Sequence, residues 1–337
     1  MPRYLLILFV FGVFAGISGT VHAQNTQIRG FIDGTSTYRK GQVSFGFEEQ
    51  DLFITSQINN RISFLGETVF KFSPSSATDF DVSIERVVFK YNYFGNNSVL
   101  FGKHHTPINY WNDTFHHGRV FFPTIYRPLL FDANIIPLHT VGISLQGQNL
   151  GTLKLGYDLM IGNGLGASDV QDDDKRKSIT AAVHIKPIDG LRIGASFYND
   201  RVAKGATVHG MPEPIKYQVN QNMVTGSVAY FGKMFEILGE STFSYNHTDT
   251  LGTKRTNASY LYAGLRVQDR LIPYAKVERI HYQAGELFYQ KNNTTSFIGG
   301  IRYEISYLAV IKLEFEHDKR EVEGTINKVT AQFAIGF

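Results

Sequence analysis

The sequence has no cysteine and only one tryptophan among its 337 residues. The absence of cysteine removes thiolates as metal ligands and suits a compartment in which stray thiols would oxidise. Charge is nearly balanced, with 33 Lys and Arg against 30 Asp and Glu, a formal net charge of +3. A near-neutral chain implies no strongly basic or acidic partner, so no nucleic-acid partner is expected. A Gly-x-Ser-x-Gly nucleophile motif is also missing, which argues against a common class of serine hydrolase.

Long apolar runs are confined to the N-terminus. Arg3 supplies a positive charge, and an apolar run from Tyr4 to about Ser18 follows it. Val21-His22-Ala23 places small residues at the two positions that a signal peptidase reads. The run is shorter than the roughly 20 residues of a membrane-spanning helix. We therefore expect residues 1–23 to be a signal peptide and residues 24–337 to be the exported protein, which carries no helical anchor.

The remainder of the chain alternates apolar and polar residues with a period of two, and no convincing helical period occurs. Such alternation over short segments bounded by turn residues predicts half-buried β-strands. Sixteen segments fit the pattern, namely 27–36, 43–58, 61–72, 80–93, 98–103, 140–148, 151–161, 178–187, 190–200, 222–231, 233–245, 257–267, 271–281, 295–304, 307–317 and 326–337. In the fourth of these the alternation slips at Glu85-Arg86, which predicts a β-bulge there.

The final segment, 326–337, indicates how the strands are arranged. Val329, Ala331, Phe333 and Ile335 share one face, and the chain stops at Phe337. In a soluble sheet this strand would be an exposed edge and a template for aggregation. A closed barrel removes the edge by pairing the last strand with the first. With its apolar face toward lipid, the segment has the length and pattern of a transmembrane β-strand.

The connections between predicted strands fall into two alternating classes. Tight turns carry residues such as Asn59-Asn60 and Gly95-Asn96-Asn97, which favour hairpins. Longer polar loops lie between them, at about 37–42, 73–79, 104–139, 162–177, 201–221, 246–256, 282–294 and 318–325. An even strand count with short turns at one end and longer loops at the other predicts an all-β, transmembrane, antiparallel up-and-down β-barrel.

On these features the whole exported chain resembles the sixteen-stranded porins of the Gram-negative outer membrane. The terminal Phe337, preceded by alternating apolar residues, is similar to the signature that such proteins present to the barrel-insertion machinery. Shorter matches to porins of the phosphate-selective type are Gly102-Lys103…Thr106-Pro107, Arg127-Pro128 and Val141-Gly142-Ile143. Their ladder of evenly spaced lumenal Arg residues has no counterpart here.

The resemblance implies a water-filled channel for passive diffusion of small polar solutes or ions, with no cofactor. It also implies a location in the outer membrane, in contact with lipid and lipopolysaccharide, and a homotrimer. In porins of this size the loop after the fifth strand narrows the pore. The longest loop here, 104–139, follows the fifth predicted strand and is unusually apolar for an external loop.

The predicted site residues belong to that loop and to the wall facing it. The expected constriction comprises Lys103, His104, Asp113, His116, Arg119, Arg127 and Asp132. These charges could instead pair with one another and hold the loop. By strand parity, the expected lumen wall comprises Arg29, Glu67, Lys71, Lys90, Lys154, Asp158, Arg192, Arg266, Arg302, Lys312, Glu314 and Lys328. Both signs are present, so weak selectivity is expected.

The histidines and one acidic loop allow other interpretations. His104-His105 and His116-His117, with His139, could suggest a metal site, but adjacent residues on an extended chain point in opposite directions. Each pair therefore offers at most one good ligand, and hydrogen-bonded loop histidines without metal are expected. The Asp run within 162–177 could bind Ca²⁺, although a solvated loop is expected. An outer-membrane barrel enzyme of the lipase or protease type, or a structural or adhesin barrel, is the alternative function.

Overall fold

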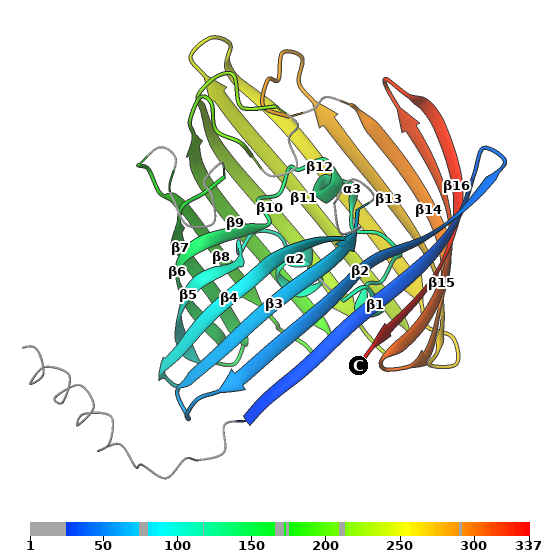
Figure 1. Ribbon diagram of the computed structural model, residues 1–337, viewed down its shortest axis with the longest axis horizontal. Helices are drawn as coiled ribbons and strands as arrows, with labels where there is room; N and C mark the ends of the chain where they lie inside the picture. The colour runs from blue at the N-terminus through cyan, green and yellow to red at the C-terminus, as the bar shows by residue number, and fades with distance from the viewer. Residues whose placement is uncertain are drawn as a thin grey trace, which may run out of the picture.

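A computed structural model of the protein describes residues 25–73, 80–116, 118–165, 172, 175–208, 213–289 and 292–337. The predicted leader 1–23 lies outside these residues. Sixteen antiparallel strands form one closed barrel in which every strand pairs with its neighbour in sequence and β1 pairs with β16 (Figure 1). The predicted all-β, up-and-down barrel and its strand count are therefore confirmed.

The strands share an up-and-down order and are tilted within the wall (Figure 1). Their bounds are β1 Asn25–Arg39, β2 Gln42–Gln57, β3 Ile62–Phe72, β4 Phe80–Phe94, β5 Asn97–His105, β6 His139–Leu150, β7 Leu155–Gly162, β8 Ser178–Ile185, β9 Leu191–Val202, β10 Val219–Phe231, β11 Phe235–Thr248, β12 Gly252–Leu265, β13 Leu271–Tyr282, β14 Thr294–Ser306, β15 Ala309–Arg320 and β16 Gly324–Gly336.

Closure occurs where the sequence predicts it. The ladder between β1 and β16 runs from Phe31 opposite Gly336 to Tyr38 opposite Val329. The backbone of Phe337 continues this pairing, because its N–H and C=O each bond to Gly30 at 2.9 Å. The last strand therefore leaves no free edge.

The two faces of the wall are inverted relative to a soluble protein. On β15, Leu313 and Phe315 are exposed, whereas Lys312 and Glu314 are buried. The same inversion places Leu159 outside and Asp158 inside on β7. An apolar exterior around a polar interior is the arrangement that suits a lipid-facing barrel.

The sequence predicts one of two local irregularities, the bulge in β4, but not the late start of β7. The register between β3 and β4 shifts after Glu67, which pairs with Arg86, while the next residue, Thr68, pairs with Ile84. Glu85 is the extra residue, so the predicted bulge is confirmed. The seventh strand, however, starts later than predicted. Lys154 has a positive φ of 48° and lies in the turn before β7, so its predicted place on the lumen wall is wrong.

The strict alternation of short and long connections is wrong at three places. β1 and β2, β11 and β12, and β15 and β16 are joined by residues 40–41, 249–251 and 321–323. The strands simply extend further than predicted, because polar residues that resemble a loop in sequence continue the ladder. Hydrogen bonding to a neighbouring strand compensates for their polarity.

The segment between β5 and β6 folds into the barrel (Figure 1). We call residues 106–138 the inward segment; His117 within it is not described. It contains α2 (Tyr110–Thr114), η1 (Arg119–Phe121) and α3 (Leu129–Asp132). None of the helices among the described residues is long and apolar enough to cross a membrane.

Candidate functional site

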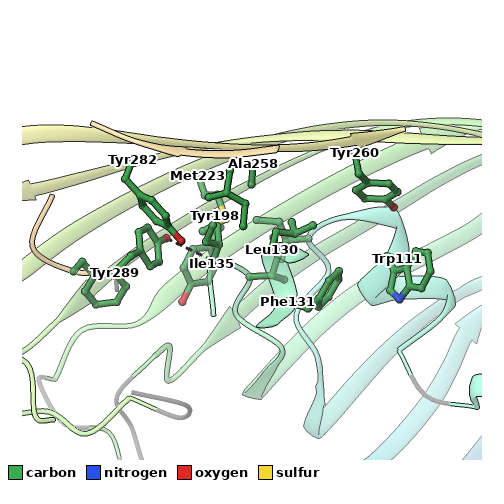
Figure 2. Close-up of a cluster of buried hydrophobic side chains, with 14 of the residues drawn as sticks. Trp111, Leu130, Phe131, Ile135, Tyr198, Met223, Ala258, Tyr260, Tyr282 and Tyr289 are labelled. Atoms are coloured by element: carbon green, nitrogen blue, oxygen red, sulfur yellow. Dashed lines mark hydrogen bonds between the residues drawn. The ribbon is translucent and has the colours of Figure 1, made fainter. Parts of the chain in front are cut away.

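The inward segment is attached to one side of the barrel by a hydrophobic core. Trp111, Phe131 and Ile135 are almost fully buried and belong to one cluster with Tyr198 and Tyr260 of the wall. Figure 2 shows these side chains between the short helices of the segment and the strands behind them. Burying large aromatic side chains is strongly favourable. The lumen beside β9–β14 is therefore filled with packed side chains.

Wall carboxylates bind the backbone of the inward segment. Glu240 on β11 accepts hydrogen bonds from the N–H groups of Tyr110 and Trp111 at the start of α2, the second of these at 3.0 Å. Glu278 on β13 accepts one from Leu129 N–H at the start of α3, at 3.2 Å. The first N–H groups of a helix have no partner within it, so a carboxylate there satisfies both hydrogen bonding and the helix dipole.

Wall cations bind carbonyl groups of the same segment. The fully buried Lys312 donates to the carbonyls of Arg119 at 2.6 Å and Thr124 at 3.0 Å. Beside it, Glu314 accepts from Ile125 N–H at 2.7 Å. Arg302 donates to the Pro123 carbonyl at 3.2 Å. These predicted lumen-wall residues thus attach the inward segment to the strands.

The basic residues of the inward segment form ion pairs with β1 and β2. Arg119 lies 3.3 Å from Glu49 and 3.7 Å from Asp33, and Arg127 lies 3.8 Å from the other oxygen of Glu49. Arg119 and Arg127 therefore hold the segment across the lumen from its hydrophobic attachment. Asp132 is exposed on α3.

An open cavity of about 590 Å³ remains on the other side, against β1–β7. It extends from His104 and Arg86, beside the inward segment, to Asn25 and Gln57 at the short-turn end of the barrel. Its charged lining residues carry both signs and are Arg86, Lys90, Asp113 and Asp158. His104 and Asp113 are the members of the predicted constriction that line this cavity.

Two of the four charged residues that line the cavity, Asp113 and Arg86, form ion pairs. Asp113, on α2, binds Arg192 of β9 at 2.7 Å. The guanidinium of Arg192 also lies 5.0 Å from the centre of the Tyr110 ring. Glu67 is buried against Arg86. The inward segment and the wall therefore share the charges that border the open part of the lumen.

The other predicted residues lie further away. Lys103 is on the opposite face of β5 from His104, and its ammonium binds the Ile84 carbonyl at 2.7 Å. His116 is buried against Asn112 of α2, with 2.6 Å between Nδ1 and the amide oxygen. The remaining wall residues are Arg29, exposed near the start of β1, Lys71, exposed near the end of β3, Arg266, paired with Glu236 and Glu304, and Lys328, paired with Glu316.

Three acidic residues with prominent contacts were absent from the predicted set. Glu236 pairs with Arg302 and Arg266, and Glu240 and Glu278 bind the inward segment. All three share the lumen-facing parity of their strands, so alternation alone could have placed them inside. The backbone partners of Glu240 and Glu278 could not be predicted, because they lie more than 100 positions earlier in the chain. Glu236 pairs instead with arginine side chains 30 and 66 positions later, which strand parity does not identify either.

Several solved structures share this barrel architecture. An anion-selective porin from Comamonas acidovorans superposes with a TM-score of 0.67 at 12% identity, over 93% of this chain and 100% of the other. The fold is that of the sixteen-stranded outer-membrane porins. The outer-membrane channel DcaP of Acinetobacter baumannii gives a TM-score of 0.65 at 11% identity, over 93% of this chain and 97% of the other.

A third similar structure is a trimer form of OmpT, an outer membrane protein of Vibrio cholerae. It gives a TM-score of 0.63 at 14% identity, over 94% of this chain and 100% of the other. No family model matches the sequence, and no curated protein matches it. At these identities the similarity establishes the fold.

Proposed function

We propose that the protein is an outer-membrane porin through which small polar solutes or ions diffuse passively. The observation that carries this proposal is the open cavity of about 590 Å³, lined by charges of both signs, beside a firmly attached inward segment. Its volume falls within the roughly 300–1,000 Å³ of sites that hold small molecules. Selectivity in pores of this kind comes from size and from the charges at the narrow part.

The charge distribution supports weak selectivity. Lys90 and Arg86 are balanced by Asp113 and Asp158 around the cavity. Arg86 and Asp113 are further compensated by the ion pairs with Glu67 and Arg192. A solute in the cavity therefore meets charges of both signs, which orient dipoles without strongly excluding either sign of ion.

Planar-bilayer recording of the refolded protein tests this function. Stepwise conductance is expected, with reversal potentials in a salt gradient that correspond to less than a roughly tenfold preference for anions or cations. Heat-denatured protein at the same concentration is the control. Absence of channels would overturn the proposal, and a stronger preference would contradict the charge argument.

The comparison with a trimeric outer membrane protein supports two further parts of the proposal, a homotrimer and a location in the outer membrane of a Gram-negative bacterium. Native mass spectrometry of the detergent-solubilised protein should give three times the mass of the chain, and conductance should rise in groups of three steps. A monomeric mass with single steps would contradict the trimer.

An assay of the same preparation on phospholipid and peptide substrates distinguishes a porin from a barrel enzyme. We expect no hydrolysis above the level of the detergent blank. Release of fatty acid or cleaved peptide in proportion to protein concentration would favour the enzyme.

A further inference from the structure

Three imidazole rings meet where the inward segment joins the barrel wall. His105 ends β5 and His139 begins β6, and the two are directly opposite in the last rung of that ladder. His116 reaches the same place from the residues after α2. One ligand nitrogen from each of the three lies within 4.8 Å of the others.

The rings are in mutual contact. The ring centroids of His116 and His105 are 4.0 Å apart, and those of His116 and His139 are 4.4 Å apart. Three separate parts of the chain thus bring their imidazole rings together.

Two of the rings are oriented from behind by oxygen atoms. Nδ1 of His139 lies 3.2 Å from a carboxylate oxygen of Glu85, and Nδ1 of His116 lies 2.6 Å from the amide oxygen of Asn112. In metal sites a ligating histidine commonly donates its other N–H to a carboxylate or carbonyl oxygen, which fixes the tautomer. With Nδ1 held in this way, Nε2 is the nitrogen directed to a metal.

We propose that His105, His116 and His139 form a binding site for one divalent transition-metal ion, of the kind that prefers imidazole, such as Zn²⁺. Neutral imidazole suits Zn²⁺, Ni²⁺ and Cu²⁺. Three protein ligands leave a fourth position for water. The proposal is independent of whether the barrel conducts.

The geometry requires a small adjustment. Zinc–nitrogen bonds of about 2.0–2.1 Å in a tetrahedral site place ligand nitrogens about 3.3 Å apart. The three rings must therefore approach by an ångström or so, which side-chain rotation supplies.

The arrangement of ligands explains why the adjacent histidine pairs predict no metal site. Each pair was expected to contribute at most one ligand, and this holds for His104-His105, in which His104 turns to the lumen. The site instead needs one histidine from each of three segments. Asn112 donates to the carbonyls of Thr106 and Leu138, at 2.9 and 3.1 Å, and so holds α2 against the ends of β5 and β6, where these segments meet.

A metal here would fasten the inward segment to the wall at its root. Two ligands belong to the strands and one to the segment, so binding would stabilise the folded arrangement by mass action. The three-histidine site lies apart from the hydrophobic attachment at β9–β14 and from the ion pairs at β1 and β2.

Metal binding to refolded protein without a polyhistidine tag tests the proposal. Isothermal titration with Zn²⁺ is expected to show one saturable site per chain, and Zn²⁺ should raise the temperature at which the barrel unfolds, an effect that EDTA reverses. With Co²⁺ as probe, the intense visible bands of a low-symmetry, nitrogen-ligated ion are expected at the same stoichiometry.

Matched histidine variants locate the site. His105→Ala and His139→Ala should each abolish the saturable binding, and Glu85→Gln should weaken it by about 10–100-fold. His104→Ala, adjacent but on the opposite face of β5, and His247→Ala, exposed near the end of β11, should leave it unchanged.

Two results would overturn the proposal. One is the absence of saturable Zn²⁺ or Co²⁺ binding to the wild-type barrel. The other is undiminished one-to-one binding after replacement of both His105 and His139. Because the wild-type titration and the Co²⁺ spectrum need no variant, a variant that fails to fold leaves the test intact.

Discussion

The ring of Phe337 lies over Gly30, so close that a Cβ atom on residue 30 would come within 2.5 Å of the ring. The same hypothetical atom would lie 2.9 Å from the Asp51 carbonyl of the next strand. The last residue of the chain thus occupies a space that the first strand leaves by having no side chain, at the seam that closes the barrel.

Replacing Gly30 by Ala should destabilise the folded barrel. The added methyl group must displace both an aromatic ring and a backbone carbonyl, and overpacking of this kind typically costs about 1–3 kcal/mol. Urea unfolding of the refolded protein in detergent micelles measures the loss. Gly226→Ala on β10 is the matched control, because its Cβ would meet nothing within 4 Å. Equal stability of the two variants would contradict the contact.

Deleting Phe337 should reduce assembly in cells much more than it reduces the stability of barrels already folded. The deletion removes one ring and two backbone hydrogen bonds from a seam that keeps its ladder from Phe31 to Tyr38. The terminal aromatic is also the feature proposed to be read by the insertion machinery. Quantifying folded protein in outer-membrane fractions, beside urea unfolding of the refolded variant, separates the two effects. Normal assembly in cells would show that Phe337 is not read.

Removing the charge of Arg302 should destabilise the barrel interior. Arg302 donates to both carboxylate oxygens of Glu236, at 2.8 and 2.9 Å, and both side chains are buried. Removing Arg302 leaves the carboxylates of Glu236 and Glu304 beside the guanidinium of Arg266, an excess of one negative charge. Taking away one partner of a buried ion pair typically costs about 3–5 kcal/mol. We therefore expect Arg302→Met to lower the urea midpoint clearly, whereas Arg29→Met, at an exposed position of β1, should change it little.

The double variant Arg302→Met/Glu236→Gln provides the internal control for that experiment. Neutralising Glu236 removes the excess negative charge and leaves Arg266 paired with Glu304, so the double variant should regain part of the lost stability despite carrying two changes. A double variant less stable than Arg302→Met would assign the loss to packing rather than to charge.

How much of this molecule the sequence predicts depends on the distance over which its residues interact. Alternation, as in Lys312, Leu313, Glu314 and Phe315, fixes the face of each side chain, because the period of a strand is two. It therefore predicts the strand count, the closure and even the bulge at Glu85.

The partners of the inward-facing charges follow different rules. Lys312 lies on the lumen face as its parity requires, and there it binds the carbonyls of Arg119 and Thr124 of the inward segment. Strand parity does not identify which groups of the inward segment contact a lumen-facing side chain. The histidines themselves suggest a metal site in the sequence, but which three of them meet could not be predicted, since His116 reaches His105 and His139 only when the inward segment docks.

Charge variants within the cavity should change ion selectivity in opposite directions. Asp158 and Lys90 both line the open part of the lumen. Replacing Asp158 by Asn removes a negative charge, so the reversal potential in a KCl gradient should move toward the equilibrium potential of Cl⁻. By the same reasoning, Lys90→Met should move the reversal potential toward the equilibrium potential of K⁺, since charged groups in a pore attract ions of the opposite sign.

The size of the shift should depend on salt, which distinguishes a field effect from a change in pore shape. At an ionic strength of about 1 M the Debye length is about 3 Å, against about 10 Å at 0.1 M, so both shifts should shrink as salt rises. Lys204→Met, exposed in the connection after β9, is the control and should leave selectivity unchanged. Shifts of the same sign in Asp158→Asn and Lys90→Met would mean that ions pass the barrel by a route other than this cavity.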